Sequence, residues 1–180
     1  MISASNCGEG DAVLLSGNLC YHHAAILSAR MNIANTIQSD CAPLNTMTAA
    51  LMKSGISIKA MRDVTRGGLA TVLNEFSAAS QCCILLDEEQ IPVSEQVHGF
   101  CGILGLDPLY MGNEGKMVAV VAGADAQKAL ACMKTCKYGE NTAIIGAVTE
   151  GEPQTVLLHT AIGGTRILTR LHGEGLPRIC

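Results

Sequence analysis

ISIKAMRDVTRGGLATVLNEFSAA, residues 56–79, places an apolar strand, a charged loop and a helix in direct succession. Residues 56–61 are typical of a short strand, and residues 69–79 of a helix. The intervening loop is Arg62-Asp63-Val64-Thr65-Arg66-Gly67-Gly68. Two glycines at the entrance of a helix let backbone N–H groups approach an anion closely, and the helix N-terminus adds partial positive charge. The stretch therefore predicts an α/β unit with polar groups gathered where the strand meets the helix.

Two interpretations of this loop remain open. In the first, Thr65 donates its hydroxyl to a phosphate, and Arg62 and Arg66 pair with it. In the second, the loop is only a tight turn between strand and helix, with Arg62 and Asp63 forming a surface ion pair. The loop matches neither the Walker A sequence nor the dinucleotide-binding fingerprint.

The alternation of strands and helices extends along the whole chain and ends in a β-rich segment, which predicts an α/β fold. Several expected strands are continuous apolar runs, so we expect a sheet covered on at least one face. We predict strands at residues 12–17, 56–61, 82–86, 116–122, 143–148, 155–159 and 165–171, and helices at 22–32, 44–53, 69–79, 94–104 and 124–136.

Composition limits the class of protein. The chain has 180 residues, of which 48% are hydrophobic, so one domain with an aliphatic core is expected. Its net charge is −4 and its basic residues are scattered, which indicates no nucleic-acid partner. No apolar run reaches the roughly 18 residues of a membrane span. The nine cysteines are an odd number without a CxxC spacing or a signal peptide, so we expect reduced thiols, no metal site and a cytoplasmic protein.

A second candidate site is the run Met111-Gly112-Asn113-Glu114-Gly115-Lys116. A carboxylate between two glycines, just before a buried strand, can act as a general base or hold Mg²⁺. The alternative is a solvated turn in which Asn and Gly adopt positive φ. A third run, Asn18-Leu19-Cys20-Tyr21-His22-His23, is interpreted as a polar cluster at the start of a helix, because adjacent histidines point apart.

The chain ends in Leu176-Pro177-Arg178-Ile179-Cys180. A terminal cysteine on a flexible tail can be loaded with a chemical group in one place and deliver it in another. Taken alone, a cysteine at this position can equally be accidental.

The run S-D-C-A-P-L at residues 39–44, the loop R-D-V-T-R-G-G, the loop G-N-E-G-K and the terminus P-R-I-C occur in this order along nearly the whole chain. Together they resemble the C-terminal half of the HypE family of hydrogenase maturation proteins, within the PurM-like superfamily. The resemblance implies an α/β (α+β-like) PurM-like C-terminal domain with a mixed sheet, helices packed on it and a flexible C-terminal tail. It implies a linker or domain fringe at residues 1–10, the domain at 11–172 and the tail at 173–180, with an ATP-binding N-terminal half outside this chain.

The function implied by the resemblance is ATP-dependent carbamoyl dehydration. Cys180 would accept a carbamoyl group from the carbamoyltransferase HypF, and Glu114 would serve the dehydration to a thiocyanate. The cyano group would then pass to iron on a HypC–HypD scaffold. Asp63, Thr65, Arg66, Gly67 and Gly68 would lie towards the nucleotide.

The resemblance also assigns most of the ATP and Mg²⁺ contacts to the N-terminal half. It implies a homodimer for the full-length protein, and we expect this chain alone to be inactive.

One departure from the family pattern is the run Cys20-Tyr21-His22-His23, where the family usually has a G-D-H-G-like sequence. Two glycines and an acidic residue are lost there. Two other functions remain open: another PurM-like ATP-dependent enzyme in which the terminal cysteine is incidental, and a non-catalytic module that docks on maturation partners.

Overall fold

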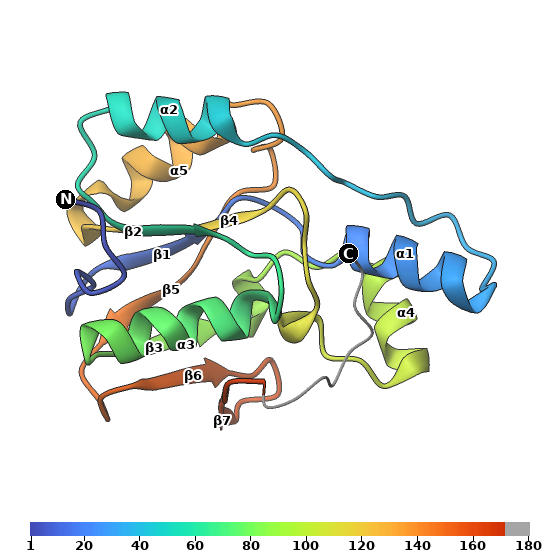
Figure 1. Cartoon of the computed structure of the whole chain (residues 1–180). Coiled ribbons are helices and arrows are strands. Elements are labelled where there is room, and N and C mark those ends of the chain that lie inside the picture. Colours follow the sequence, from blue (N-terminus) through green and yellow to red (C-terminus); the bar gives the residue numbers. More distant parts are fainter. Residues whose placement is uncertain (172–180) are drawn as a thin grey trace.

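One mixed sheet organises the chain, shown by a computed structural model that describes residues 1–171 (Figure 1). The strand order is β2-β4-β1-β5-β3-β6-β7. β3 and β6 pair in parallel and the other neighbours pair antiparallel, so the expected mixed sheet is confirmed. The strands are β1 (Ala12–Leu15), β2 (Ile58–Asp63), β3 (Cys83–Asp87), β4 (Met117–Val121), β5 (Ala143–Thr149), β6 (Thr155–His159) and β7 (Thr165–Ile167).

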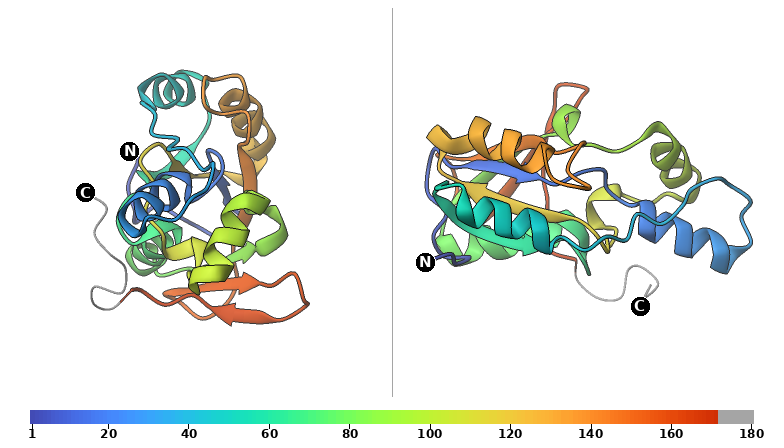
Figure 2. Two further views of the ribbon diagram at one scale, coloured as in Figure 1. Left: turned by 90° about the vertical axis from the view of Figure 1, so that its right-hand side faces the viewer. Right: turned by 90° about the horizontal axis from the view of Figure 1, so that it is seen from above.

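Helices cover both faces of the sheet and one of its ends. α2 and α5 lie side by side on one face, α3 lies on the other, and α1 and α4 extend beyond one end (Figures 1 and 2). The helices are α1 (Tyr21–Met31), α2 (Asn45–Lys53), α3 (Gly68–Ser80), α4 (Glu95–Leu104) and α5 (Ala126–Lys134), with 3₁₀ turns η1 (Glu88–Gln90), η2 (Pro108–Tyr110) and η3 (Gly123–Asp125).

The central strands are apolar throughout because both of their faces are buried. In β1, Val13 and Leu15 join the core beneath α3, whereas Leu14 joins the core beneath α2 and α5. β4 alternates in the same way, with Val118 and Val120 on the α3 side and Met117 and Val121 on the other. Since side chains point alternately to opposite faces of a strand, two helical layers require apolar residues at every position.

Several boundaries differ from the sequence-based prediction; the strand predicted at 12–17, for example, ends at Leu15. β2 continues through Arg62 and Asp63, which pair with β4, so the connection to α3 begins at Val64 rather than at Arg62. The last strand ends at Ile167 instead of residue 171. The helix predicted at 124–136 is shorter, because 3₁₀ turn η3 precedes it and α5 ends at Lys134. The predicted tail at 173–180, including Cys180, lies outside the described residues.

Candidate functional site

The residues predicted from two separate loops meet in one pocket. Asp63 at the end of β2, Thr65 just after it and Glu114 before β4 line a hollow of about 250 Å³. Glu114 is half-buried, so its carboxylate lies at the pocket rather than in open solvent. The pocket is completed by Ala42, Leu44, Gly115 and Lys116.

The Asn113 side chain links the segments next to this pocket by hydrogen bonds. Its Oδ1 accepts a hydrogen bond from the backbone N–H of Cys20 at 2.7 Å. Its Nδ2 donates to the carbonyl oxygens of Val64 and Met111, both at 3.1 Å. The backbone N–H of Asn113 donates to the same Val64 oxygen at 3.0 Å. Asn113 is 1% exposed, so these bonds fix the Glu114 loop against the segment that follows β2.

Gly67 and Gly68 both have positive φ, at 76° and 67°. A Cβ on Gly68 would stand 2.5 Å from the carbonyl oxygen of Leu109, and one on Gly67 would meet the Thr71 side chain. The space left by the missing side chains is therefore filled by the chain itself. Neither glycine lines the Glu114 pocket, and their contact with phosphate stays a prediction.

Neither arginine of the loop lines the pocket. Arg62 forms its ion pair with Glu75 on α3 rather than with Asp63. Arg66 is exposed and is not part of the pocket lining. Of the five residues expected near the nucleotide, the structure thus brings Asp63 and Thr65 to Glu114.

An ion pair between buried Lys116 and half-buried Asp40 borders the pocket, and the sequence analysis gave this pair no role. Lys116 is 6% exposed, and its Nζ lies 2.5 Å from Oδ2 of Asp40 and donates to the Gly115 carbonyl at 3.3 Å. The neighbouring Ala42 N–H donates to the Glu114 carbonyl at 3.1 Å. Two signals were available, since Lys116 and Asp40 both belong to runs quoted for their resemblance to a known family.

Lys116 and Asp40 also line a second, larger hollow of about 400 Å³. Its walls come from the exit of β1, the start of α1 and the loop between α5 and β5. They include Asn18, Tyr21, Tyr138 and Glu140. The ion pair therefore stands between two hollows at the same end of the sheet.

The two adjacent histidines contact different segments. His22 Nδ1 is 2.8 Å from the Ser39 hydroxyl. His23 is buried, and its Nδ1 accepts from the Gly112 N–H at 3.0 Å. Burial lowers the pKa of His23, with smaller contributions from the positive charges of His22 and Arg30. Neutral His23 thus supports the Glu114 loop from the α1 side.

The departure at residue 20 is accommodated without a glycine. Cys20 adopts a positive φ of 75° immediately before α1, and its thiol donates to the Pro108 carbonyl at 3.0 Å. Burial raises the pKa of Cys20 strongly, so the side chain is a packed neutral thiol. Cys20 joins the start of α1 to the η2 segment and does not line either hollow.

Within residues 1–171, no group of three or more His, Cys, Asp or Glu side chains is placed to hold a metal ion. Asp63 and Glu114 are the carboxylates of the smaller pocket, and two carboxylates fall short of such a set. No helix in the same part of the chain is long and apolar enough to cross a membrane.

Comparison with known proteins connects this geometry to a family. Residues 8–159 match the family described as AIR synthase related protein, C-terminal domain. The chain is 44% identical to carbamoyl dehydratase HypE of Cupriavidus necator, over 100% of this chain and 52% of that protein. It is 41% identical to carbamoyl dehydratase HypE of Rhodobacter capsulatus, over 99% of this chain and 53% of that protein. The chain therefore spans about half the length of the curated relatives it matches.

Several solved structures similar to this chain are also HypE proteins. A crystal structure of hydrogenase maturation protein HypE superposes with a TM-score of 0.93 and 41% identity, covering 99% of this chain and 58% of that one. The crystal structure of HypE in complex with ATP superposes with a TM-score of 0.93 and 39% identity, covering 99% of this chain and 55% of that one. The crystal structure of a HypE–HypF complex superposes with a TM-score of 0.89 and 42% identity, covering 94% of this chain and 56% of the matched chain. Thiamine monophosphate kinase from Aquifex aeolicus, 17% identical with a TM-score of 0.61 over 87% of this chain and 52% of that one, shares the fold alone.

Proposed function

Since the chain belongs to the AIR synthase related protein, C-terminal domain family and has a PurM-like fold, we propose that it is the C-terminal part of an ATP-dependent carbamoyl dehydratase. The enzyme converts an S-carbamoyl group on Cys180 to a thiocyanate, whose cyanide is donated to iron in [NiFe] hydrogenase maturation. The observation that carries the proposal is the convergence of Asp63, Thr65 and Glu114 on one pocket, in a chain similar over its whole length to proteins named carbamoyl dehydratase.

The reaction requires a better leaving group than an amide oxygen. In the first stage the carbamoyl oxygen takes the terminal phosphoryl group of ATP, so an O–P bond forms, the bond to ADP breaks and one amide proton is released. In the second stage the C–O bond breaks and inorganic phosphate leaves with the electron pair. Glu114 accepts the remaining N–H proton as the C≡N bond forms, which is general-base catalysis.

Three features of the chain suit these stages. Glu114 is half-buried and presents a carboxylate to the pocket, where it can accept a proton from a bound carbamoyl group. Thr65 offers a hydroxyl to the same pocket. The N-terminus of α3, at Gly67 and Gly68, has partial positive charge, and Arg66 adds a cation, both of which favour a nucleotide phosphate nearby.

ATP use is supported by the relative solved in complex with ATP. We propose that Mg²⁺ and most ATP contacts belong to an N-terminal half outside this chain, because residues 1–171 present no set of three metal-binding side chains. The assignment of Cys180 as the carrier rests on its sequence, since it lies outside the described residues.

The proposed partners follow from the chemistry. A carbamoyltransferase of the HypF kind supplies the carbamoyl group, supported by the solved HypE–HypF complex. A HypC–HypD scaffold receives the cyano group. The full-length protein acts as a homodimer in the cytoplasm.

The test is mass spectrometry of the full-length protein after incubation with HypF, carbamoyl phosphate and ATP. We expect a thiocyanate confined to Cys180, and an unconverted carbamoyl adduct in Glu114→Gln. Cys180→Ser is the control and should gain neither.

Absence of any adduct on the wild-type protein contradicts the proposal. Full activity of Cys180→Ser would favour another PurM-like enzyme acting on a small molecule. Binding of the maturation partners that is indifferent to nucleotide, without conversion, would favour a docking module.

A further inference from the structure

Lys116 is the most deeply buried charged side chain at the Glu114 pocket. It is 6% exposed, and it lines both this pocket and the larger hollow. The aliphatic part of its side chain passes over Gly17, where an added Cβ would stand 3.4 Å from Cε of Lys116. A lysine enclosed in this way has lost most of its hydration, so its ammonium interacts strongly with any nearby negative charge.

The hydrogen-bonding capacity of this ammonium is not used up. An ammonium has three N–H donors. Within residues 1–171, Lys116 has two acceptors, Oδ2 of Asp40 at 2.5 Å and the Gly115 carbonyl at 3.3 Å. The partner is incomplete too, because Oδ1 of Asp40 is buried without a hydrogen-bond partner among the described residues. A purely structural ion pair is stable when the remaining donors and acceptors are satisfied, and here one of each is left over.

Lys116 and Glu114 are separated by one glycine and face the same pocket. A cation and a carboxylate therefore line one pocket, where both can act on the same bound group. We propose that Lys116 is a second catalytic residue, whose ammonium donates a hydrogen bond to the oxygen of the carbamoyl group. The inference rests on the function proposed above and assigns to it a residue that acts on oxygen, while Glu114 acts on nitrogen.

The separate roles of Lys116 and Glu114 follow from where negative charge develops during the reaction. As the C–O bond breaks in the second stage, negative charge builds up on the carbamoyl oxygen, which until then bridges carbon and phosphorus without a charge of its own. A fixed ammonium stabilises this charge in the transition state more than in the uncharged carbamoyl ground state, which is the condition for faster catalysis. Asp40 is a positioning residue in this scheme, since it holds the ammonium in place.

The experiment uses the full-length protein, first carbamoylated on Cys180 by the partner enzyme. ATP is then added, and the single-turnover rate of thiocyanate formation is followed by mass spectrometry. The variants are Lys116→Met, Lys116→Arg, Asp40→Asn and the double variant Asp40→Asn/Lys116→Met. Melting temperature is measured for each one, so that folding is monitored separately from rate.

We expect Lys116→Met to accept the carbamoyl group normally and to dehydrate it at least about 100-fold more slowly, as for loss of one transition-state donor. Lys116→Arg keeps the charge and should recover part of the rate. Asp40→Asn should slow the reaction less than Lys116→Met. The double variant removes both charges together and should regain melting temperature without regaining rate.

A structural role gives the opposite pattern, in which the rate of the double variant returns along with its stability. That result, or a Lys116→Met rate within about threefold of wild type, overturns the inference. If Lys116→Met does not fold, the rate of the double variant decides. Wild-type protein that never gains a carbamoyl group contradicts the proposed function itself, whereas wild type and double variant that convert equally well contradict only the role of Lys116.

Discussion

The backbone N–H of Cys20 donates a 2.7 Å hydrogen bond to Oδ1 of Asn113, although the two residues are 93 positions apart in the chain. This bond joins the exit of β1 to the loop that carries Glu114. Because the other side of the Asn113 amide donates to Val64, a single side chain connects the exit of β1, the segment after β2 and the Glu114 loop.

Replacing Asn113 with Ala should lower the free energy of unfolding by about 1–3 kcal/mol, since the Cys20 N–H loses its acceptor, while the Val64 carbonyl keeps its bond from the residue 113 backbone. Urea denaturation measures the change. Asn141→Ala is the control, because Asn141 is exposed, and it should change the stability by less than about 0.5 kcal/mol. A loss below about 1 kcal/mol for Asn113→Ala would show that the bonds contribute little.

Gly68→Ala should destabilise the protein by about 3 kcal/mol or more, because the new Cβ meets the Leu109 carbonyl at 2.5 Å and φ is +67°. Gly102→Ala is a matched control. Gly102 lies inside α4 with nothing within 4 Å of an added Cβ, so alanine there should stabilise by about 0.5–1 kcal/mol. Thermal denaturation of the two variants should therefore shift in opposite directions. Equal shifts would contradict the packing of Gly68 against η2.

Stability should fall on mild acidification because of His23. Burial lowers its pKa below the usual 6.5, so the unfolded chain binds a proton at a higher pH than the folded one. The stability due to neutral His23 is therefore fully present above about pH 6.5 and is lost as the pH falls through the folded-state pKa. Urea denaturation from pH 7.5 to 5 should show this slope, reduced in His23→Gln. An unchanged slope in that variant would assign the effect to other groups.

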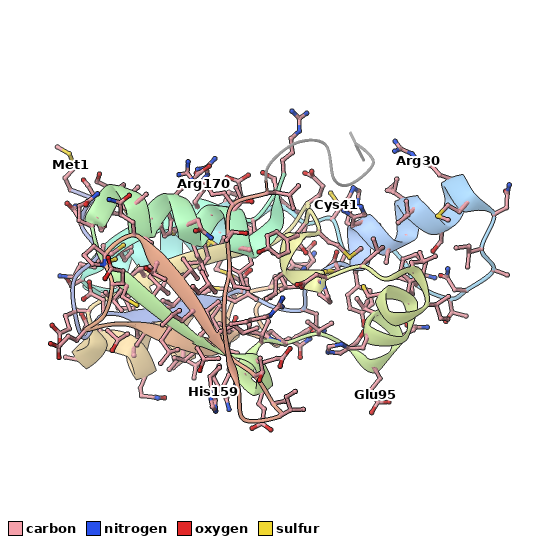
Figure 3. All side chains as sticks on the ribbon, turned by 90° about the horizontal axis from the view of Figure 1, so that it is seen from below. Met1, Arg30, Cys41, Glu95, His159 and Arg170 are labelled. Carbon is pink, nitrogen blue, oxygen red and sulfur yellow. The ribbon has the colours of Figure 1, made fainter. Side chains whose placement is uncertain are left out.

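Thiol reactivity should be confined to a few positions. Burial raises the pKa of Cys82 and Cys101 to about 11, whereas Cys41 is exposed. Figure 3 places Cys41 and Arg30 towards the end of the molecule that carries α1, with Met1 at the other end. In a Cys180→Ser background, iodoacetamide at pH 8 should modify Cys41 first, because thiolate is the nucleophile. Peptide mapping checks this, and faster labelling of Cys101 would contradict the burial of α4.

The central strands could be predicted from sequence and the edges could not. β1 and β4 are buried on both faces, so their apolar runs appear directly in the sequence. β2 ends in Arg62 and Asp63, whose exposed side chains resemble a loop although their backbone pairs with β4. Hydrophobic patterning reports burial, and an edge strand needs little of it.

The candidate site also contains residues that local sequence indicates and a contact that it does not. Thr65 precedes a Gly-Gly pair at a helix start and Glu114 lies between two glycines before a strand, so local sequence made both candidates, and their roles stay predictions. The Asp40–Lys116 ion pair joins residues that are far apart, and no spacing in the sequence predicts it. Long-range polar contacts of this kind depend on the completed sheet, and therefore on the structure.

The position of β1 in the middle of the sheet affects how the chain is made. Ala12 pairs with Val121 and Ala147, so β1 has no neighbour in this sheet until Val121 has been translated. At about 5–20 residues per second this delay is on the order of ten seconds. The nascent apolar strand therefore stays without its partners during that time, and the centre of the sheet closes only after β4 and β5 have been made.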